Sequence, residues 1–115
     1  MAYIDGFLLA VPNENKEKYI ESSKAFAAYV KTHGALSVHE YWGDDVPDGK
    51  LTSFPMAVKL EPGETVVFSW IEWPDKATRD AGNKKMMEDP EMANMDMPFD
   101  GKRMMYGGFA KLSEG

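Results

Sequence analysis

Apolar residues gather in four stretches of the chain that have the length and composition of β-strands. Each stretch is rich in aromatic, β-branched or other apolar side chains; the four cover residues 2–11, 35–42, 65–73 and 102–112. The third, TVVFSWIEW, carries the strongest strand signal in the chain. Pro12 and Pro74 follow the first and third stretches at once and are expected to end them, because proline lacks the N–H that a strand donates.

Two further segments have the spacing of helices that bury one side. Segment 14–33 repeats apolar or small residues about one helical turn apart, at Tyr19, Ser23, Phe26, Ala27 and Val30. Asn13 stands where a helix N-cap is expected, and Gly34 where a C-cap glycine is expected.

The second predicted helix covers residues 76–88. Asp75 is a suitable N-cap for it, and Pro90 follows its end. Its small residues, Ala77, Ala81 and Gly82, form a side suited to close packing.

This order of elements predicts an α+β fold, a ferredoxin-like βαββαβ sandwich formed by a single domain over residues 1–115. Segment 53–60, SFPMAVKL, fits that order poorly, because a full strand there would reverse the direction of the next one. Pro55 also weakens it as a strand. The segment is therefore expected as an extra edge strand.

The strands at 2–11 and 65–73 are apolar on both alternating sides, as Val66, Phe68 and Trp70 against Val67 and Ile71 illustrate. An antiparallel sheet with one face in water alternates apolar and polar residues instead. Two helices cover one face of a four-stranded sheet, so the second face needs another partner. The economical partner is the same face of a second copy, which predicts a homodimer with the architecture of a dimeric α/β barrel.

Composition and charge indicate the cellular compartment and exclude some classes of binding partner. The chain has 115 residues, no cysteine and a net charge of −6. The missing cysteines exclude disulfides and thiol nucleophiles and fit a reducing compartment. The negative charge argues against binding to nucleic acid or to an anionic membrane. The apolar start is short, interrupted by Asp5 and without a basic leader, so a cytoplasmic location is expected.

Five motifs carry a family resemblance across essentially the whole chain: YIDGFLLAVP, WGDDVPDGK, FSWIEWP, NKKMMEDP and MPFDGKRMMYGGF. With them the chain resembles the YbaA-like family of bacterial proteins of unknown function, within the dimeric α/β-barrel superfamily. That resemblance implies ferredoxin-like subunits whose sheets pack face to face in a dimer, and it supplies no activity.

The superfamily includes cofactor-free monooxygenases, haem-degrading enzymes, lactone isomerases and proteins without known chemistry. Its haem-degrading members use a histidine on the second helix and an asparagine on the first strand. Here segment 76–88 has no histidine and the first strand offers Asp5, so haem degradation by that arrangement is not expected.

Glu40 is the candidate acid or base. It alternates in register with Leu36, Val38 and Trp42, so its carboxylate is expected on an apolar side of its strand. Burial raises the pKa of a carboxyl and suits it to proton transfer near neutral pH. The alternative is that Glu40 lies near the sheet edge or pairs with a basic residue across the dimer.

Aromatic residues and one arginine complete the expected site. Trp42, Trp70 and Tyr106 are candidate walls of a pocket for a planar apolar ligand, and the alternative places them in the core and the dimer interface. Arg79 is a candidate partner for an acidic ligand group, and its simpler role is an ion pair with Asp75, four residues earlier.

Other patterns argue against a metal or phosphate cofactor. His33 and His39 lie on different elements, and the spacing of Asp44, Asp45 and Asp48 is that of a turn and not of a calcium loop. Gly101 precedes a strand, whereas phosphate loops precede a helix.

Methionines are dense near the end of the chain, at Met86, Met87, Met92, Met95, Met97, Met104 and Met105. A copper(I) site is one interpretation, and flexible packing around an adaptable apolar pocket is favoured.

These observations predict a homodimer without cofactors that binds a small apolar or aromatic molecule. The first hypothesis is a cofactor-free oxygenase or isomerase acting on a small aromatic or lactone-like molecule, with Glu40 as acid or base. The alternatives are a non-catalytic small-molecule-binding or stress-response dimer, and an interaction module whose aromatic residues only form the dimer interface.

Overall fold

The computed structural model of the chain describes residues 2–95 and 97–115 as an antiparallel sheet with its two long helices on one face. The four strands are β1 (Tyr3–Pro12), β2 (Ser37–Trp42), β3 (Glu64–Trp73) and β4 (Met105–Ala110). Their order across the sheet is β2-β3-β1-β4, with every neighbouring pair antiparallel. This order confirms the predicted ferredoxin-like fold.

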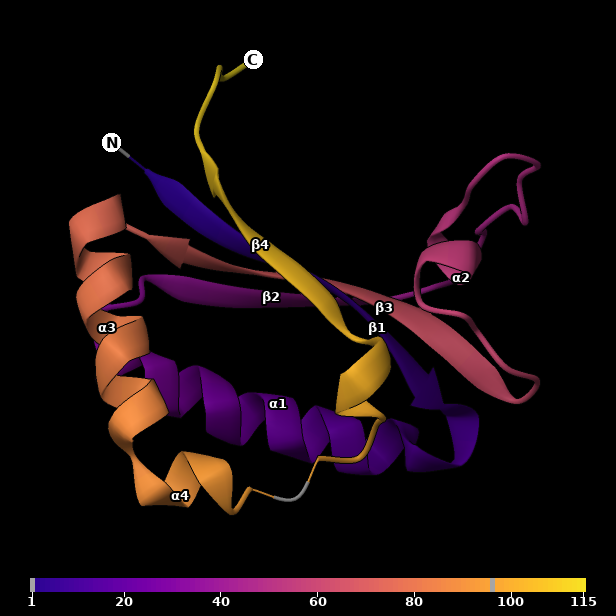
Figure 1. Cartoon of the computed structure of the whole chain (residues 1–115), viewed down its shortest axis with the longest axis horizontal. Helices are drawn as coiled ribbons and strands as arrows, with labels where there is room; N and C mark the ends of the chain where they lie inside the picture. The colour runs from indigo at the N-terminus through magenta and orange to yellow at the C-terminus, as the bar shows by residue number, and fades with distance from the viewer. Residues whose placement is uncertain (1, 96) are drawn as a thin grey trace.

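Two long helices lie on the same side of the sheet, as Figure 1 shows: α1 (Lys16–Lys31), which follows the short 3₁₀ helix η1 (Asn13–Asn15), and α3 (Lys76–Glu88). Asp75 caps α3 as expected, since its side chain accepts a hydrogen bond of 2.7 Å from the Thr78 backbone N–H. Gly34 follows α1 with φ of +105°, a conformation that glycine adopts readily. Within the described residues, no helix is long and apolar enough to span a bilayer.

The expected edge strand at 53–60 is wrong. Residues Phe54–Ala57 form the short helix α2, which lies on the side of the sheet opposite α1 (Figure 1). The Ser53 hydroxyl accepts a hydrogen bond from the Met56 backbone N–H at 3.1 Å, which caps this helix. Pro55 lies in its first turn, where a missing N–H costs nothing.

The sheet face away from α1 and α3, named here the open face, is only partly covered by the chain itself. Val58, just after α2, is fully buried against Ala10 and Val66 at one end of this face. Phe54 of α2 packs edge-on against Phe68, with ring centroids 6.0 Å apart. The face carries large apolar residues that are exposed or half-buried: Ile4, Tyr41, Phe68, Trp70, Met105 and Phe109.

The opposite face packs tightly against the helices around Trp73, which is fully buried. Gly82 on α3 allows this packing, because a Cβ there would lie 2.8 Å from both the indole of Trp73 and the His33 carbonyl oxygen. The small-residue side expected on this helix therefore packs closely, with Gly82 against Trp73.

A buried ion pair fastens α3 to β1. Asp5 is 3% exposed and accepts hydrogen bonds from Arg79 Nη2 at 2.7 Å and from the Trp73 indole N–H at 3.0 Å. Arg79 also pairs with Asp80 at 3.0 Å, so the expected pairing with Asp75 is wrong. The reason is that Asp75 is engaged as the helix cap and Asp5 faces the helix from the sheet. Gly108 leaves room for this pair, because a Cβ there would lie 2.9 Å from Arg79 Nη2.

Replacing Asp5 with alanine is expected to lower the free energy of unfolding by about 3 kcal/mol, because Arg79 loses its buried partner and the Trp73 indole N–H loses its acceptor. Urea denaturation followed by circular dichroism at pH 7 measures the change. Lys76→Ala is the control, since it removes an exposed ion pair with Asp80 and is expected to change stability little. A loss for Asp5→Ala no larger than that of the control would contradict the role of this pair.

Candidate functional site

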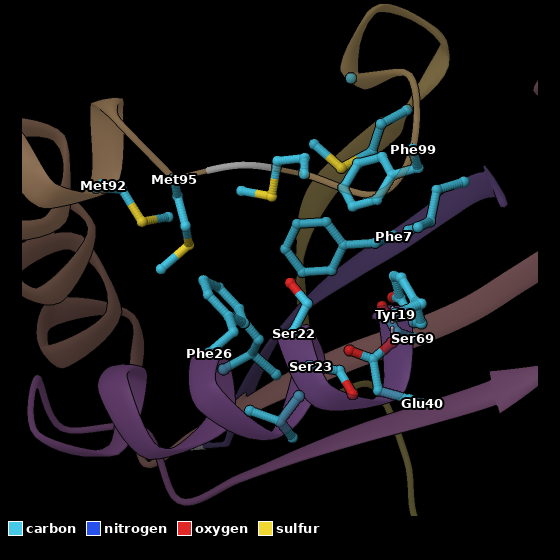
Figure 2. A pocket seen from close by; sticks show the side chains of 16 residues that line it. Phe7, Tyr19, Ser22, Ser23, Phe26, Glu40, Ser69, Met92, Met95 and Phe99 are labelled. Carbon is cyan, nitrogen blue, oxygen red and sulfur yellow. Dashed lines mark hydrogen bonds between the residues drawn. The ribbon is translucent and has the colours of Figure 1, made fainter. Parts of the chain in front are cut away.

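A cavity of about 260 Å³ lies between the sheet and α1. Its floor comes from β1, β2 and β3, its side wall from α1, and its roof from the methionine-rich segment after α3 (Figure 2). The lining residues are, from the sheet, Phe7, Leu9, Val38, Glu40, Ser69 and Ile71, and from α1, Tyr19, Ser22, Ser23 and Phe26. The roof is formed by Met92, Met95, Met97, Phe99, Gly101 and Met104.

Polar contacts tie the roof to the body of the protein. The Asn15 side-chain amide donates to the Pro98 carbonyl oxygen at 3.1 Å. Arg103 donates from Nη1 and Nη2 to the two oxygens of Glu64, each at 2.7 Å, and this pairing lowers the pKa of the Glu64 carboxyl. At the other end of the roof, the Tyr29 hydroxyl donates to Asp89, which precedes the short helix α4 (Pro90–Ala93). The roof is thus held on both sides of the cavity.

The polar groups of the cavity gather at one end. The Tyr19 hydroxyl donates to Glu40 Oε1 at 2.7 Å, and the Ser69 hydroxyl also hydrogen-bonds the Glu40 carboxylate. Figure 2 shows these three side chains together, with Met92 and Met95 toward the other end of the cavity. The cavity therefore has an apolar body and one acidic end.

Burial controls the protonation of this acidic end. Loss of water raises the pKa of the Glu40 carboxyl, and the hydrogen bonds from Tyr19 and Ser69 oppose that effect without cancelling it. Burial and the neighbouring Glu40 charge also raise the pKa of the Tyr19 hydroxyl, which therefore stays protonated as a donor. A carboxyl with a raised pKa at the end of an apolar cavity is suited to accept and return a proton.

Strand alternation explains why Glu40 points into the cavity. On β2, Val38, Glu40 and Trp42 face the helices, whereas His39 and Tyr41 lie on the open face. Glu40 pairs across the sheet with Ser69 of β3, and α1 brings Tyr19 above both. The apolar register of β2 therefore carries one carboxyl group into the space beneath α1.

The other expected pocket residues do not line this cavity. Trp42 lies on the same face as Glu40, packs beside Leu9 and Val11, and has the Lys16 ammonium 5.0 Å from its ring centroid. Trp70 lies on the open face, where its ring stacks with those of His39 and Tyr41.

Tyr106 and Arg79 also lie outside the lining. Tyr106 stacks on Phe7 with ring centroids 6.1 Å apart and is 71% exposed, so it supports a lining residue from outside. Arg79 is engaged with Asp5 and Asp80. Of the five residues expected in one pocket, the structure brings only Glu40 to the cavity wall.

Sequence reasoning missed Tyr19 and Ser69 as partners of Glu40. Tyr19 was expected on the inner side of its helix, which is the available signal for it. Ser69 is a small polar residue within a strongly apolar strand, and its burial to 4% exposure is informative only when its partner across the sheet is known.

The described part of the chain contains no cluster of three or more histidine, aspartate or glutamate residues placed to hold a metal ion. Gly49, in the loop with Asp44, Asp45 and Asp48, has φ of +67°, the left-handed conformation that was expected for it. Asp100 accepts a hydrogen bond from the Lys102 backbone N–H at 3.0 Å and caps the short 3₁₀ helix η2 (Gly101–Arg103) that leads into β4. Asp100-Gly101-Lys102 therefore directs the chain into β4.

Comparisons with known proteins agree with the fold. Residues 2–101 match the family described as "Protein of unknown function (DUF1428)". The uncharacterized protein YbaA of Escherichia coli strain K12 is 55% identical over 114 residues, which are 97% of this chain and 97% of that protein. These matches confirm the family resemblance found in the sequence motifs.

Two solved structures share the fold. Rv0793 from Mycobacterium tuberculosis has a TM-score of 0.58 and 13% identity, covering 99% of this chain and 98% of that one. A dimeric ferredoxin-like protein from an uncultured marine organism has a TM-score of 0.54 and 12% identity, covering 95% of this chain and 92% of that one. At such identities the likeness is one of fold alone.

The raised pKa of Glu40 predicts a pH dependence of stability with a definite sign. The folded protein binds this proton more tightly than the unfolded chain, whose carboxyl titrates near 4.5. The stabilisation is therefore complete below that pH and is lost as pH rises through the raised pKa. We expect the unfolding free energy of the wild type to fall relative to that of Glu40→Gln as pH rises above about 4.5.

Urea denaturation of both proteins across pH 4–8 measures this difference. Tyr19→Phe is expected to raise the pKa of Glu40 further, because it removes a donor to the charged carboxylate, and carbon-13 NMR of the carboxyl group reports that pKa. Ser22→Ala, which alters another hydroxyl of the cavity wall, is the control. A stability difference that does not vary with pH would contradict the raised pKa.

Proposed function

The chain belongs to the DUF1428 family of proteins of unknown function, and we propose that it is a homodimeric enzyme that moves a proton on a small, mostly apolar molecule. The observation that carries this proposal is the Glu40 carboxyl at the polar end of an apolar cavity. Apolar cavities with a few convergent polar groups and a perturbed pKa are typical of active sites.

Isomerisation is the reaction class that this arrangement favours. Such a reaction needs one group that accepts a proton from one atom of the substrate and returns it to another, and no further reactant. Glu40 as carboxylate takes the first proton, and as carboxylic acid it returns it. The neutral Tyr19 hydroxyl would stabilise negative charge that develops beside it. A cofactor-free oxygenase begins with the same proton removal and takes O₂ as its second reactant.

Glu40→Gln is expected to lower the turnover of any identified substrate by about 10²-fold or more, since glutamine fills the space but carries no proton to exchange. Screening of small aromatic and lactone-like compounds, followed by stopped-flow kinetics, provides the measurement. Glu88→Gln, an exposed carboxylate at the end of α3, is the matched control and is expected to leave turnover unchanged. Equal turnover in the wild type and Glu40→Gln would refute the acid–base role.

The second candidate is a binding protein without catalysis. It is favoured by the two hydroxyls that already hydrogen-bond Glu40, an arrangement that also suits a fixed anchor for a ligand. In that case Glu40→Gln would weaken binding and no substrate would turn over. Turnover of a bound compound by the wild type therefore distinguishes the two candidates.

The open face supports the proposed homodimer. It contains the stacked rings of Trp70 and Tyr41 and the exposed side chains of Phe68 and Phe109. An apolar patch of this kind marks an interaction site in soluble proteins. A second copy is the partner we propose, because a structure with the same fold is described as a dimeric ferredoxin-like protein. A two-fold axis would place the same face on both subunits.

Charge and composition support two further parts of the proposal: that nucleic acid is not a partner, and that the protein is cytoplasmic. A net charge of −6 argues against nucleic acid as a partner, and the absence of cysteine fits the cytoplasm.

Trp70→Glu is expected to convert the dimer to monomers, because it places a charge in the centre of an apolar interface. Analytical ultracentrifugation at micromolar concentration reports the mass. Met87→Glu is the matched control, since Met87 is also exposed but belongs to α3, and it is expected to leave the dimer intact. A wild-type protein that sediments as a monomer would exclude the dimer.

A further inference from the structure

We propose that the ligand of the Glu40 cavity is a small amine with an apolar, aromatic-sized body, bound with its ammonium group against the Glu40 carboxylate. This inference rests on the function proposed for the same cavity and names its substrate class. Three features of the cavity support it: its uncompensated acidic group, its walls, and its surroundings.

The first feature is the missing counter-charge. Among the described residues that line the cavity, Glu40 is acidic and none is basic. Its hydrogen-bond donors, Tyr19 and Ser69, are neutral hydroxyls. A buried carboxylate without a cation is costly, and a ligand that brings the cation removes that cost. An anionic ligand would meet the opposite situation, since it would add a like charge beside Glu40.

The walls suit the rest of such a ligand. Phe7, Phe26 and Phe99 contribute aromatic rings to the lining, and ring faces attract ammonium groups as well as apolar surface. The methionines of the roof supply polarizable thioethers on unbranched side chains, which adapt to ligands of different shape. A cavity of about 150 Å³ holds one benzene molecule. The larger volume here therefore suits one ring with a short chain that ends in the amine.

The surroundings of the cavity are also acidic. A second, more open hollow of about 590 Å³ shares Ser22 and Met97 with the cavity, so the two adjoin at the edge of α1. Glu17 and Glu21 line this hollow against a single basic residue, Lys18. Together with the net charge of −6, this arrangement attracts cations toward the cavity and repels anions.

The test compares two probes of nearly equal shape, 2-phenylethylamine and 2-phenylethanol, by isothermal titration calorimetry of the full chain at pH 7. The wild type is expected to bind the amine about tenfold or more tightly than the alcohol, as close charge pairs in protected sites allow. Glu40→Gln is expected to remove this preference while still binding the alcohol. Glu88→Gln, outside both hollows, is expected to retain the preference.

The possible results separate this inference from the proposed function. Equal or tighter binding of the alcohol by the wild type would overturn the amine class and leave the cavity as a site for neutral ligands. Absence of binding by both probes up to millimolar concentration would also overturn the amine class, and the role of Glu40 would then be judged by the turnover experiment alone. An amine preference that persists in Glu40→Gln would show that another group binds the ammonium and would likewise overturn the assignment.

Discussion

The architecture depends on one constraint: the two central strands, β1 and β3, are apolar on both faces, and the long helices cover only one of them. On the helix side, Trp73 and its neighbours form a closed core. On the open face, α2 and Val58 cover one end and leave an aromatic surface at the other. The buried ion pair of Asp5 and Arg79 holds α3 on the face that the long helices cover.

Local chemistry made most of the fold predictable from the sequence. Pro12, Asp75 and Pro90 mark boundaries through backbone effects that act whatever the tertiary structure, and the structure has its elements begin or end at those positions. The prediction of a strand at 53–60 was wrong for a related reason. Its apolar residues were interpreted as strand pattern, whereas Ser53 and Pro55 together favour the first turn of a helix. These two residues were visible in the sequence, but the prediction gave more weight to the apolar composition of the segment.

The candidate site was predictable only in part. Alternation along one strand was sufficient to place Glu40 on an apolar side, because it involves a single element. The walls around it come from α1, three strands and the roof, and no single segment determines which of them meet. Trp70 illustrates the limit: its aromatic character suggested a pocket, but its parity on β3 assigns it to the open face. Tyr19 and Ser69 became partners of Glu40 only through the register of β2 with β3 and the position of α1.

The roof has a consequence for how such a protein can diverge. Met92, Met95, Met97 and Phe99 line the cavity but belong to no strand of the sheet, and the roof is held by a few polar contacts at its edges. Substitutions at these positions would therefore change the volume and shape offered to a ligand while leaving strand pairing and helix packing as they are. Relatives with the same sheet and the same acidic group could in this way acquire different ligands, each through a handful of changes in one short, contiguous stretch of the gene.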